Sequence, residues 1–162
     1  MTDNDKNVAD NSLSKIDINI LRALQKDGRK TYADLSRQVG LTSTPCMERV
    51  KRLERDNIIE GYEAKVNPEA LGMGLVVFVH VGLHRSAQDS FGQFNEAINE
   101  IPEIQECFLV SGSFDYLLKV RTKDMSAYRK FYGEVLLSLP GVEECSTYVA
   151  MEQVKETTAI PL

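Results

Sequence analysis

The stretch TYADLSRQVGLTSTPCMERVKRLER, residues 31–55, decides the fold of the N-terminal part of the chain. Thr31 can cap a short helix, and Gly40 can end it. The segment that follows has helical periodicity, with cations on one side and an apolar side opposite. That apolar side carries Cys46, Val50 and Leu53. Two short helices joined by a Gly-containing turn are typical of a helix-turn-helix motif, here at about residues 32–51.

The second helix of such a motif enters the DNA major groove by its N-terminal end. Small polar residues there approach base edges, and arginines reach bases or phosphates. We therefore expect double-stranded DNA as a partner. The residues expected near bases are Ser43, Thr44, Pro45, Glu48, Arg49 and Arg52, and those expected near phosphates are Lys51 and Arg55. Thr42, which can cap the helix, is also expected at DNA. A solvated helix face is the plainer interpretation of the same charges.

Flanking segments complete a winged helix-turn-helix domain over residues 13–67. An apolar helical stripe precedes the motif, with Ser14 as a plausible cap and Asp17 three residues later. After the motif, IEGYEAKVNP (59–68) alternates loosely around a glycine and suits a short β-wing. Residues 1–12 are polar and lack the apolar core of a signal peptide, so we expect a disordered tail. Residues 68–74 contain two glycines and suit a linker.

Charge is unevenly distributed along the chain, whose net charge is −5. Residues 1–66 hold 12 Lys and Arg against 11 Asp and Glu, and residues 67–162 hold 7 against 13. The acidity therefore lies in the C-terminal part. No apolar run approaches the roughly 18 residues that a membrane helix needs. Three cysteines without paired spacing fit a reducing cytoplasm rather than a secreted disulfide scaffold.

Residues 75–162 predict a ferredoxin-like βαββαβ domain, which makes the whole chain α+β. LVVFVHVGL (75–83) is continuously apolar and suits a central strand. A helix is expected at about 88–100, two strands flank the turn at 110–116, a second helix follows Asp124, and the last strand covers about 142–151. An internal sequence repeat supports this order, because IPEIQEC (101–107) is similar to LPGVEEC (139–145).

This architecture separates Cys107 from Cys145, because the strands that carry them lie at opposite edges of the sheet. Both read as packing residues. The two helices cover one face of the sheet, and the other face is apolar whether it carries Phe78 and His80 or their valine neighbours. Exposed apolar faces usually mark interfaces, so we expect sheet-against-sheet dimers.

Catalytic and metal-binding signals are weak. His80 and His84 are four residues apart on one strand, and no Cys or carboxylate has a ligand spacing to them. The chain lacks a Gly-rich phosphate loop and a nucleophile signature. We therefore expect no enzyme activity, no metal and no cofactor.

Three segments carry a family resemblance. DGRKTYADLSRQVGLTSTPCMERVKRLERDNIIEGY, together with ECFLVSGSFDYLLKV and DMSAYRKF, strongly resembles the Lrp/AsnC (feast/famine) family of bacterial transcription regulators, closest to its leucine-responsive branch. The likeness covers about residues 13–155. It implies an effector-binding and oligomerisation domain of the RAM or ACT-like kind, amino-acid effectors, and dimers that assemble further, commonly into octamers. A cytoplasmic, nucleoid-associated protein is expected.

The resemblance also implies an effector site where dimers meet, around a Gly-x-x-Asp-Tyr turn. The matching positions are Gly112, Ser113, Asp115 and Tyr116 in the turn, Leu109 before it, and Met125, Tyr148, Val149 and Ala150 elsewhere. Asp115 can receive the ammonium of an amino acid, with leucine or methionine favoured. The rival interpretation makes Asp115 a structural turn acid.

Three functions from different classes stay open. The first is an amino-acid-sensing regulator, which controls genes of amino-acid metabolism or nutrient response. The second is a DNA-organising architectural protein whose C-terminal domain only oligomerises. The third is a ferredoxin-like enzyme with a fused helical domain.

Overall fold

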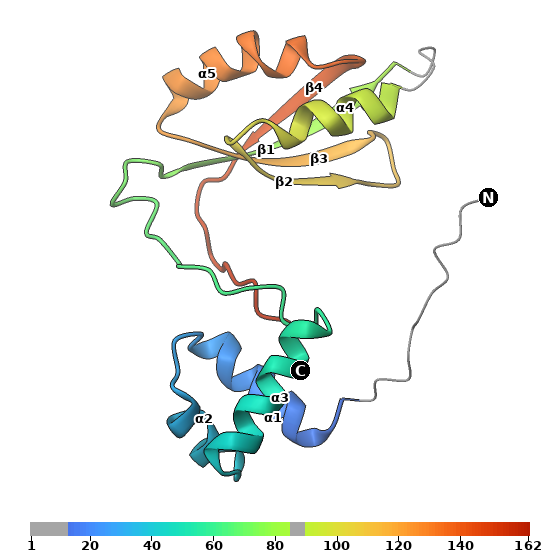
Figure 1. The fold of residues 1–162 in the computed structure, drawn as a ribbon. Coiled ribbons are helices and arrows are strands. Elements are labelled where there is room, and N and C mark those ends of the chain that lie inside the picture. The colour runs from blue at the N-terminus through green and yellow to red at the C-terminus, as the bar shows by residue number, and fades with distance from the viewer. Residues whose placement is uncertain (1–12, 85–89) are drawn as a thin grey trace, which may run out of the picture. The chain divides into compact units, whose positions relative to one another are not determined.

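The computed structural model describes residues 13–84 and 90–162, which divide into two compact units. One unit runs to Lys65 and includes Thr157–Leu162, whereas the other is Val66–Glu156. Figure 1 shows helices in the first unit and a sheet with helices along it in the second. The expected tail at residues 1–12 and the start of the helix expected at about 88 lie outside the described residues.

The first unit consists of three helices around a small apolar core. They are α1 (Lys15–Lys26), α2 (Tyr32–Val39) and α3 (Ser43–Arg55). The buried apolar residues are Ile20, Leu21, Ala23, Leu35, Cys46, Val50 and Leu53. The predicted helix-turn-helix core is confirmed, with Cys46 as a small, fully buried hydrophobe.

Local sequence signals set the helix ends. Ser14 and Asp17 form a reciprocal capping box at the start of α1, and Thr31 accepts a hydrogen bond from the backbone N–H of Asp34 at the start of α2. Gly40 ends α2 with a φ of 73°, a left-handed conformation that favours glycine. The chain can therefore turn sharply between α2 and α3.

The segment expected to form the wing has no regular secondary structure here. Between residues 56 and 74 the described chain contains no strand, because a β-ladder needs a neighbouring segment and none pairs here. The Tyr62 side chain holds the segment instead, since its hydroxyl donates a hydrogen bond to Glu54 at 2.9 Å. Burial and this carboxylate raise the pKa of Tyr62 to about 12.

The second unit is a four-stranded antiparallel sheet with helices on one side, as Figure 1 shows. Its elements, in chain order, are β1 (Leu75–Leu83), α4 (Ser90–Asn99), β2 (Ile104–Leu109), β3 (Tyr116–Thr122), α5 (Met125–Glu134), the short 3-10 helix η1 (Leu136–Ser138) and β4 (Val142–Val149). The strand order β2-β3-β1-β4 confirms the predicted ferredoxin-like plan, with β1 in the interior of the sheet.

The internal sequence repeat at residues 101–107 and 139–145 corresponds to a repeated turn. The N–H of Ile104 bonds to the carbonyl of Ile101 at 3.1 Å, and the N–H of Val142 bonds to that of Leu139 at 3.3 Å. Each turn leads directly into an edge strand. The cysteines on these two edges, β2 and β4, are free, and burial raises the pKa of both thiols.

Candidate DNA-binding and effector sites

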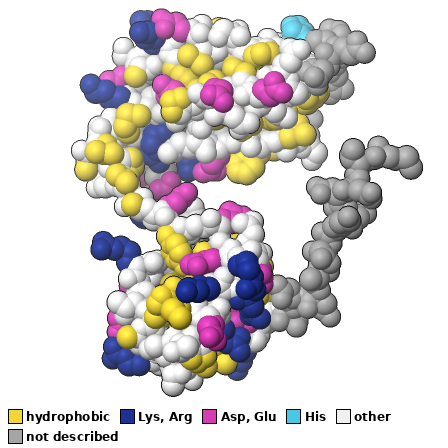
Figure 2. Space-filling view, viewed as in Figure 1, with side chains coloured by type: hydrophobic (Ala, Val, Ile, Leu, Met, Phe, Trp, Pro, Cys, Tyr) yellow, Lys and Arg dark blue, Asp and Glu magenta, His cyan; other side chains and the backbone are white. Residues whose placement is uncertain are grey.

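The outer side of α3 presents most of the residues expected at DNA. Thr42, Ser43, Thr44, Glu48, Lys51 and Arg55 are exposed, and Pro45 is half-buried. Thr42 is the N-cap residue, but its side chain makes no capping hydrogen bond. Figure 2 shows Lys and Arg side chains over this unit, with Asp and Glu between them. Small polar groups and cations are thus open to a ligand on α3.

Two of the expected base-contacting residues are tied to α1. Arg49 Nη1 donates a hydrogen bond to Asp17 Oδ1 at 2.9 Å, and Arg52 Nη2 donates to Asp17 Oδ2 at 2.8 Å. The Asp17 side chain is 1% exposed, against 33% for Arg49 and 38% for Arg52. The two guanidinium groups are therefore half-covered and anchored from the protein side.

The charge on Asp17 is stabilised by its partners. Burial opposes ionisation, but hydrogen bonds from Ser14, Arg49 and Arg52 lower the pKa of Asp17 to about 2. The Ser14 hydroxyl donates to Oδ2 at 2.6 Å, and the Ser14 backbone N–H donates to the same oxygen at 3.0 Å. Asp17 is consequently a fixed carboxylate that joins the start of α1 to the middle of α3.

Asp115, in the turn between β2 and β3, is hydrogen-bonded to the backbone of β1. The half-buried Asp115 accepts a hydrogen bond on Oδ2 from the backbone N–H of Leu83 at 2.8 Å. Its own backbone N–H donates to Val81 at 3.0 Å, and its carbonyl accepts from Val110 at 2.9 Å. Gly112 and Ser113, at the tip of the turn, are exposed. Asp115 therefore fastens the turn to the end of β1.

Tyr116 is a core residue. It is 2% exposed, its ring lies 4.6 Å from that of Phe94, and its hydroxyl donates to the Asn95 side chain at 2.8 Å. Burial raises its pKa. Tyr116 can thus support the turn from beneath, but its side chain does not face solvent.

The expected effector residues fall into two groups at opposite ends of the sheet. The turn and Leu109 lie at the Leu83 end of β1, because Tyr116 pairs with both Val81 and Leu109. Val149 pairs with Val77, and Ala150 bonds to Val76, near the other end. Met125 begins α5 just beyond that end of β3. At about 3.3 Å per residue, several residues of strand separate the groups.

An aromatic row lies on the face of the sheet that the helices leave open. The His80 ring stacks on Phe114 at 3.7 Å and lies 4.4 Å from the ring of Tyr148. Phe108 shares this face because it is paired with Leu117, which is paired with His80. Phe78, Phe108 and Tyr148 are 37%, 51% and 52% exposed. Aromatic side chains thus lie along this face and reach the turn between β2 and β3 through Phe114. The expectation of an apolar face is only partly right, because Lys119 pairs with Phe78 and forms an ion pair with Glu106 at 2.7 Å on the same face.

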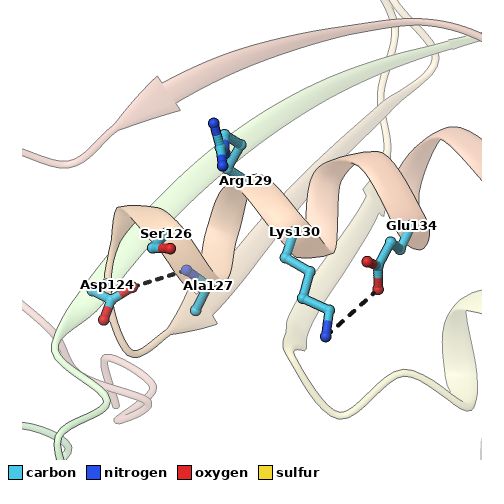
Figure 3. A pocket seen from close by; sticks show the side chains of 6 residues that line it. All are labelled: Asp124, Ser126, Ala127, Arg129, Lys130 and Glu134. Carbon is cyan, nitrogen blue, oxygen red and sulfur yellow. Dashed lines mark hydrogen bonds and ion pairs between the residues drawn. The ribbon is translucent and has the colours of Figure 1, made fainter.

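A shallow hollow lies along α5, and the expected effector residues are not among those that line it. Figure 3 shows its lining, with the Asp124 carboxylate capping Ala127 and Lys130 beside Glu134. Across residues 13–84 and 90–162, His, Cys, Asp and Glu form no group of three or more that could hold a metal ion. In the same residues, no helix is long and apolar enough to cross a membrane.

Sequence reasoning missed two connections. The first is the pair of hydrogen bonds that Asp17 accepts from Arg49 and Arg52. A sequence signal was present, because Asp17 lies on the apolar stripe of α1, four residues from both Leu13 and Leu21, and a buried carboxylate needs a partner. The second is the stack of Phe114 on His80, for which the sequence contains no signal because the two residues are distant along the chain.

Comparisons with known proteins agree with both units. Residues 76–160 match the Lrp/AsnC ligand binding domain, and residues 13–60 match a winged helix-turn-helix DNA-binding domain. The leucine-responsive regulatory proteins of Escherichia coli K12 and Klebsiella pneumoniae are 57% identical over 148 residues, which cover 91% of this chain and 90% of theirs.

Solved structures of transcriptional regulators are also similar to this chain. A transcriptional regulator of Neisseria meningitidis in complex with L-Met superposes with a TM-score of 0.89 at 37% identity, over 93% of this chain and 97% of that one. An AsnC family regulator of Agrobacterium tumefaciens superposes with a TM-score of 0.87 at 35% identity, over 91% of this chain and 96% of that one.

Proposed function

The chain belongs to the Lrp/AsnC family of DNA-binding transcriptional regulators with an amino-acid-binding domain, and we propose that its effectors are leucine and methionine. The similarity to leucine-responsive regulators and to a regulator in complex with L-Met supports both ligands. Because its relatives are transcriptional regulators, no catalytic step is part of the proposal.

Asp115 would receive the ligand's ammonium group. Among the described residues only its Oδ2 has a partner, the backbone N–H of Leu83, so Oδ1 would accept a charge-assisted hydrogen bond worth roughly 1.5–3 kcal/mol. Backbone N–H groups at Gly112 and Ser113 suit the ligand carboxylate. An acid fixed by the fold beside an exposed turn is the observation that carries the proposal.

The apolar wall of the site would come from a second chain. Leu109 lies beside the turn, but Met125, Tyr148, Val149 and Ala150 lie toward the other end of the sheet. One small amino acid cannot touch both groups within one chain, whereas two chains that meet end to end can bring them together. This separation supports a ligand site between subunits.

The open sheet face would form the dimer. Its exposed aromatic residues are costly to leave in water, and each buried large side chain contributes about 1.5–3 kcal/mol. Such dimers would assemble further, with octamers as the expected end point. Assembly matters for DNA binding because each chain is acidic overall and one helix-turn-helix unit alone would bind DNA weakly. Several units that bind the same DNA molecule together would reach a higher affinity.

Ligand binding between subunits would favour one assembly over another, with a coupling of about 1–3 kcal/mol. The assembly determines how many copies of α3 face DNA and at what spacing. The residues at bases would be Ser43, Thr44, Pro45, Glu48, Arg49 and Arg52. Lys51 and Arg55 would lie at phosphates, and Thr42 would lie at DNA at the start of α3. The protein would act in the cytoplasm, in association with the nucleoid.

A second candidate function is a DNA-organising protein without an effector. The bond between Asp115 and Leu83 favours it, because it gives the turn acid a structural role that needs no ligand. A thermal-shift panel of the twenty amino acids separates the two candidates. We expect leucine and methionine to raise the melting temperature. Stabilisation by no amino acid would leave only the architectural function.

A further inference from the structure

Asp17 holds two arginines of α3 while leaving most of their hydrogen-bonding capacity unused. A guanidinium group has five N–H donors. Among the described residues, the hydrogen bonds of Arg49 go from Nη1 to Asp17 and Ser14, and that of Arg52 goes from Nη2 to Asp17. The Nε and the second terminal nitrogen of each arginine stay available for a ligand.

Stability alone is a weak explanation for this arrangement. A buried ion pair often contributes no more than an apolar contact of the same volume would, because both charges must be desolvated. A shared carboxylate does, however, fix two long and flexible side chains in one geometry. Bidentate recognition of a base edge by arginine needs such a fixed geometry.

We propose that Asp17 is a positioning residue for DNA recognition, which orients Arg49 and Arg52 so that their free N–H edges reach base edges. The inference rests on the proposed function, in which these two arginines contact DNA. Asp17 itself lies in α1 and is 1% exposed, so its side chain is too buried to contact DNA. It acts only through the arginines that it binds.

The variant Asp17→Asn has opposite effects on specific and non-specific binding if this is correct. It removes a negative charge behind two cations, so binding to poly(dI-dC) becomes equal or tighter by a few-fold. It also releases the arginines, so binding to a duplex enriched by the wild-type chain from a random-sequence pool becomes at least tenfold weaker. A purely structural role would weaken both kinds of binding together.

A mutant cycle tests whether Asp17 acts through the arginines. The four proteins are the wild type, Asp17→Asn, Arg49→Ala/Arg52→Ala, and the combination of all three substitutions. We expect Asp17→Asn to change the ratio of specific to non-specific affinity at least tenfold in the wild type and less than twofold when the arginines are absent. An equal change in both backgrounds, or none in the wild type, would overturn the inference.

Two further variants complete the experiment. Asp34→Asn is the matched control, since the Asp34 carboxylate also accepts a hydrogen bond from a helix-capping hydroxyl, that of Thr31, and pairs with an arginine, Arg37, but is exposed on α2. It should leave the affinity ratio unchanged. If Asp17→Asn fails to fold, Asp17→Glu keeps the charge and displaces the guanidinium groups, and it should lower the ratio to a similar extent. An unchanged ratio in folded Asp17→Glu would also overturn the inference.

The variant Arg49→Ala/Arg52→Ala distinguishes the proposed base contacts of the arginines from the proposed positioning role of Asp17. If Arg49→Ala/Arg52→Ala binds the enriched duplex as tightly as the wild type, the proposed base contacts are wrong, and the inference is wrong with them. If that variant binds weakly while folded Asp17→Asn keeps the wild-type affinity ratio, the contacts stand and only the positioning role of Asp17 is wrong.

Discussion

The backbone N–H of Leu83 donates a hydrogen bond to the carboxylate of Asp115, with 2.8 Å between the nitrogen and Oδ2. This bond joins the last residue of β1 to the turn between β2 and β3. Leu83 is buried, so its N–H group would otherwise lack a partner. One carboxylate oxygen thus stabilises the fold. The other has no hydrogen-bond partner among residues 13–84 and 90–162 and is the one that we propose binds a ligand, so the two roles are separable by substitution.

Asp115→Asn and Asp115→Ala are predicted to differ. The asparagine keeps an oxygen acceptor for Leu83 but loses the charge, so stability should be nearly unchanged while leucine and methionine bind roughly 10- to 150-fold more weakly. The alanine also leaves the Leu83 N–H unsatisfied, so it should cost about 1–3 kcal/mol of unfolding free energy. Calorimetric titration and chemical denaturation measure the two effects. If Asp115→Asn binds leucine and methionine as tightly as the wild type does, Asp115 has only a structural role.

Acid sensitivity of the helical unit should depend on Asp17. Its folded-state pKa of about 2 lies below the ordinary value of 3.8, so the charged form is favoured in the folded protein. The resulting stability, about 2 kcal/mol, is fully present above pH 4 and is lost as the pH falls toward 2. Denaturation followed by circular dichroism should show a shallower decline in Asp17→Asn. Parallel decline in both proteins would contradict this assignment.

A charge on the open sheet face should disrupt self-association. Phe108→Glu introduces a carboxylate into the proposed interface, where desolvating it is costly, so sedimentation velocity should show smaller species than for the wild type. Leu137→Glu is the control, because Leu137 lies in η1, outside the sheet, and both side chains are 51% exposed. Equal effects of the two substitutions would argue against this face as the interface.

Salt dependence should identify the phosphate contact of Lys51. Lys51→Ala is expected to weaken binding to all duplexes similarly and to reduce the slope of log affinity against log salt by about 1 per binding unit. Lys130→Ala, which removes an exposed cation from α5 (Figure 3), should leave the slope unchanged. A slope that is the same for Lys51→Ala and the wild type would place this lysine away from the DNA backbone.

Periodicity and local caps made the fold predictable from sequence. The caps at Ser14, Thr31 and Asp124 depend on residues three positions away, and the apolar pattern of β1 already indicates an interior strand. The unpaired wing segment was less predictable. Alternation reports a preference for strand, but a strand also needs a neighbouring segment, and sequence does not show where that neighbour lies.

The candidate sites were only partly predictable. Resemblance supplied the turn at Asp115, but sequence could not show that its carboxylate is already bound by Leu83 or that Tyr116 is buried beneath it. Helical periodicity placed Arg49 and Arg52 opposite the apolar side of α3. It could not show that a carboxylate from α1 reaches them, because that contact depends on how α1 packs against α3.

Sedimentation velocity of the full chain at micromolar concentration, with and without L-leucine or L-methionine, tests the central claim most directly. We expect a species larger than one chain, and a change in its size distribution when either amino acid is added. A single chain that sediments identically in all three conditions would contradict an effector site built between subunits.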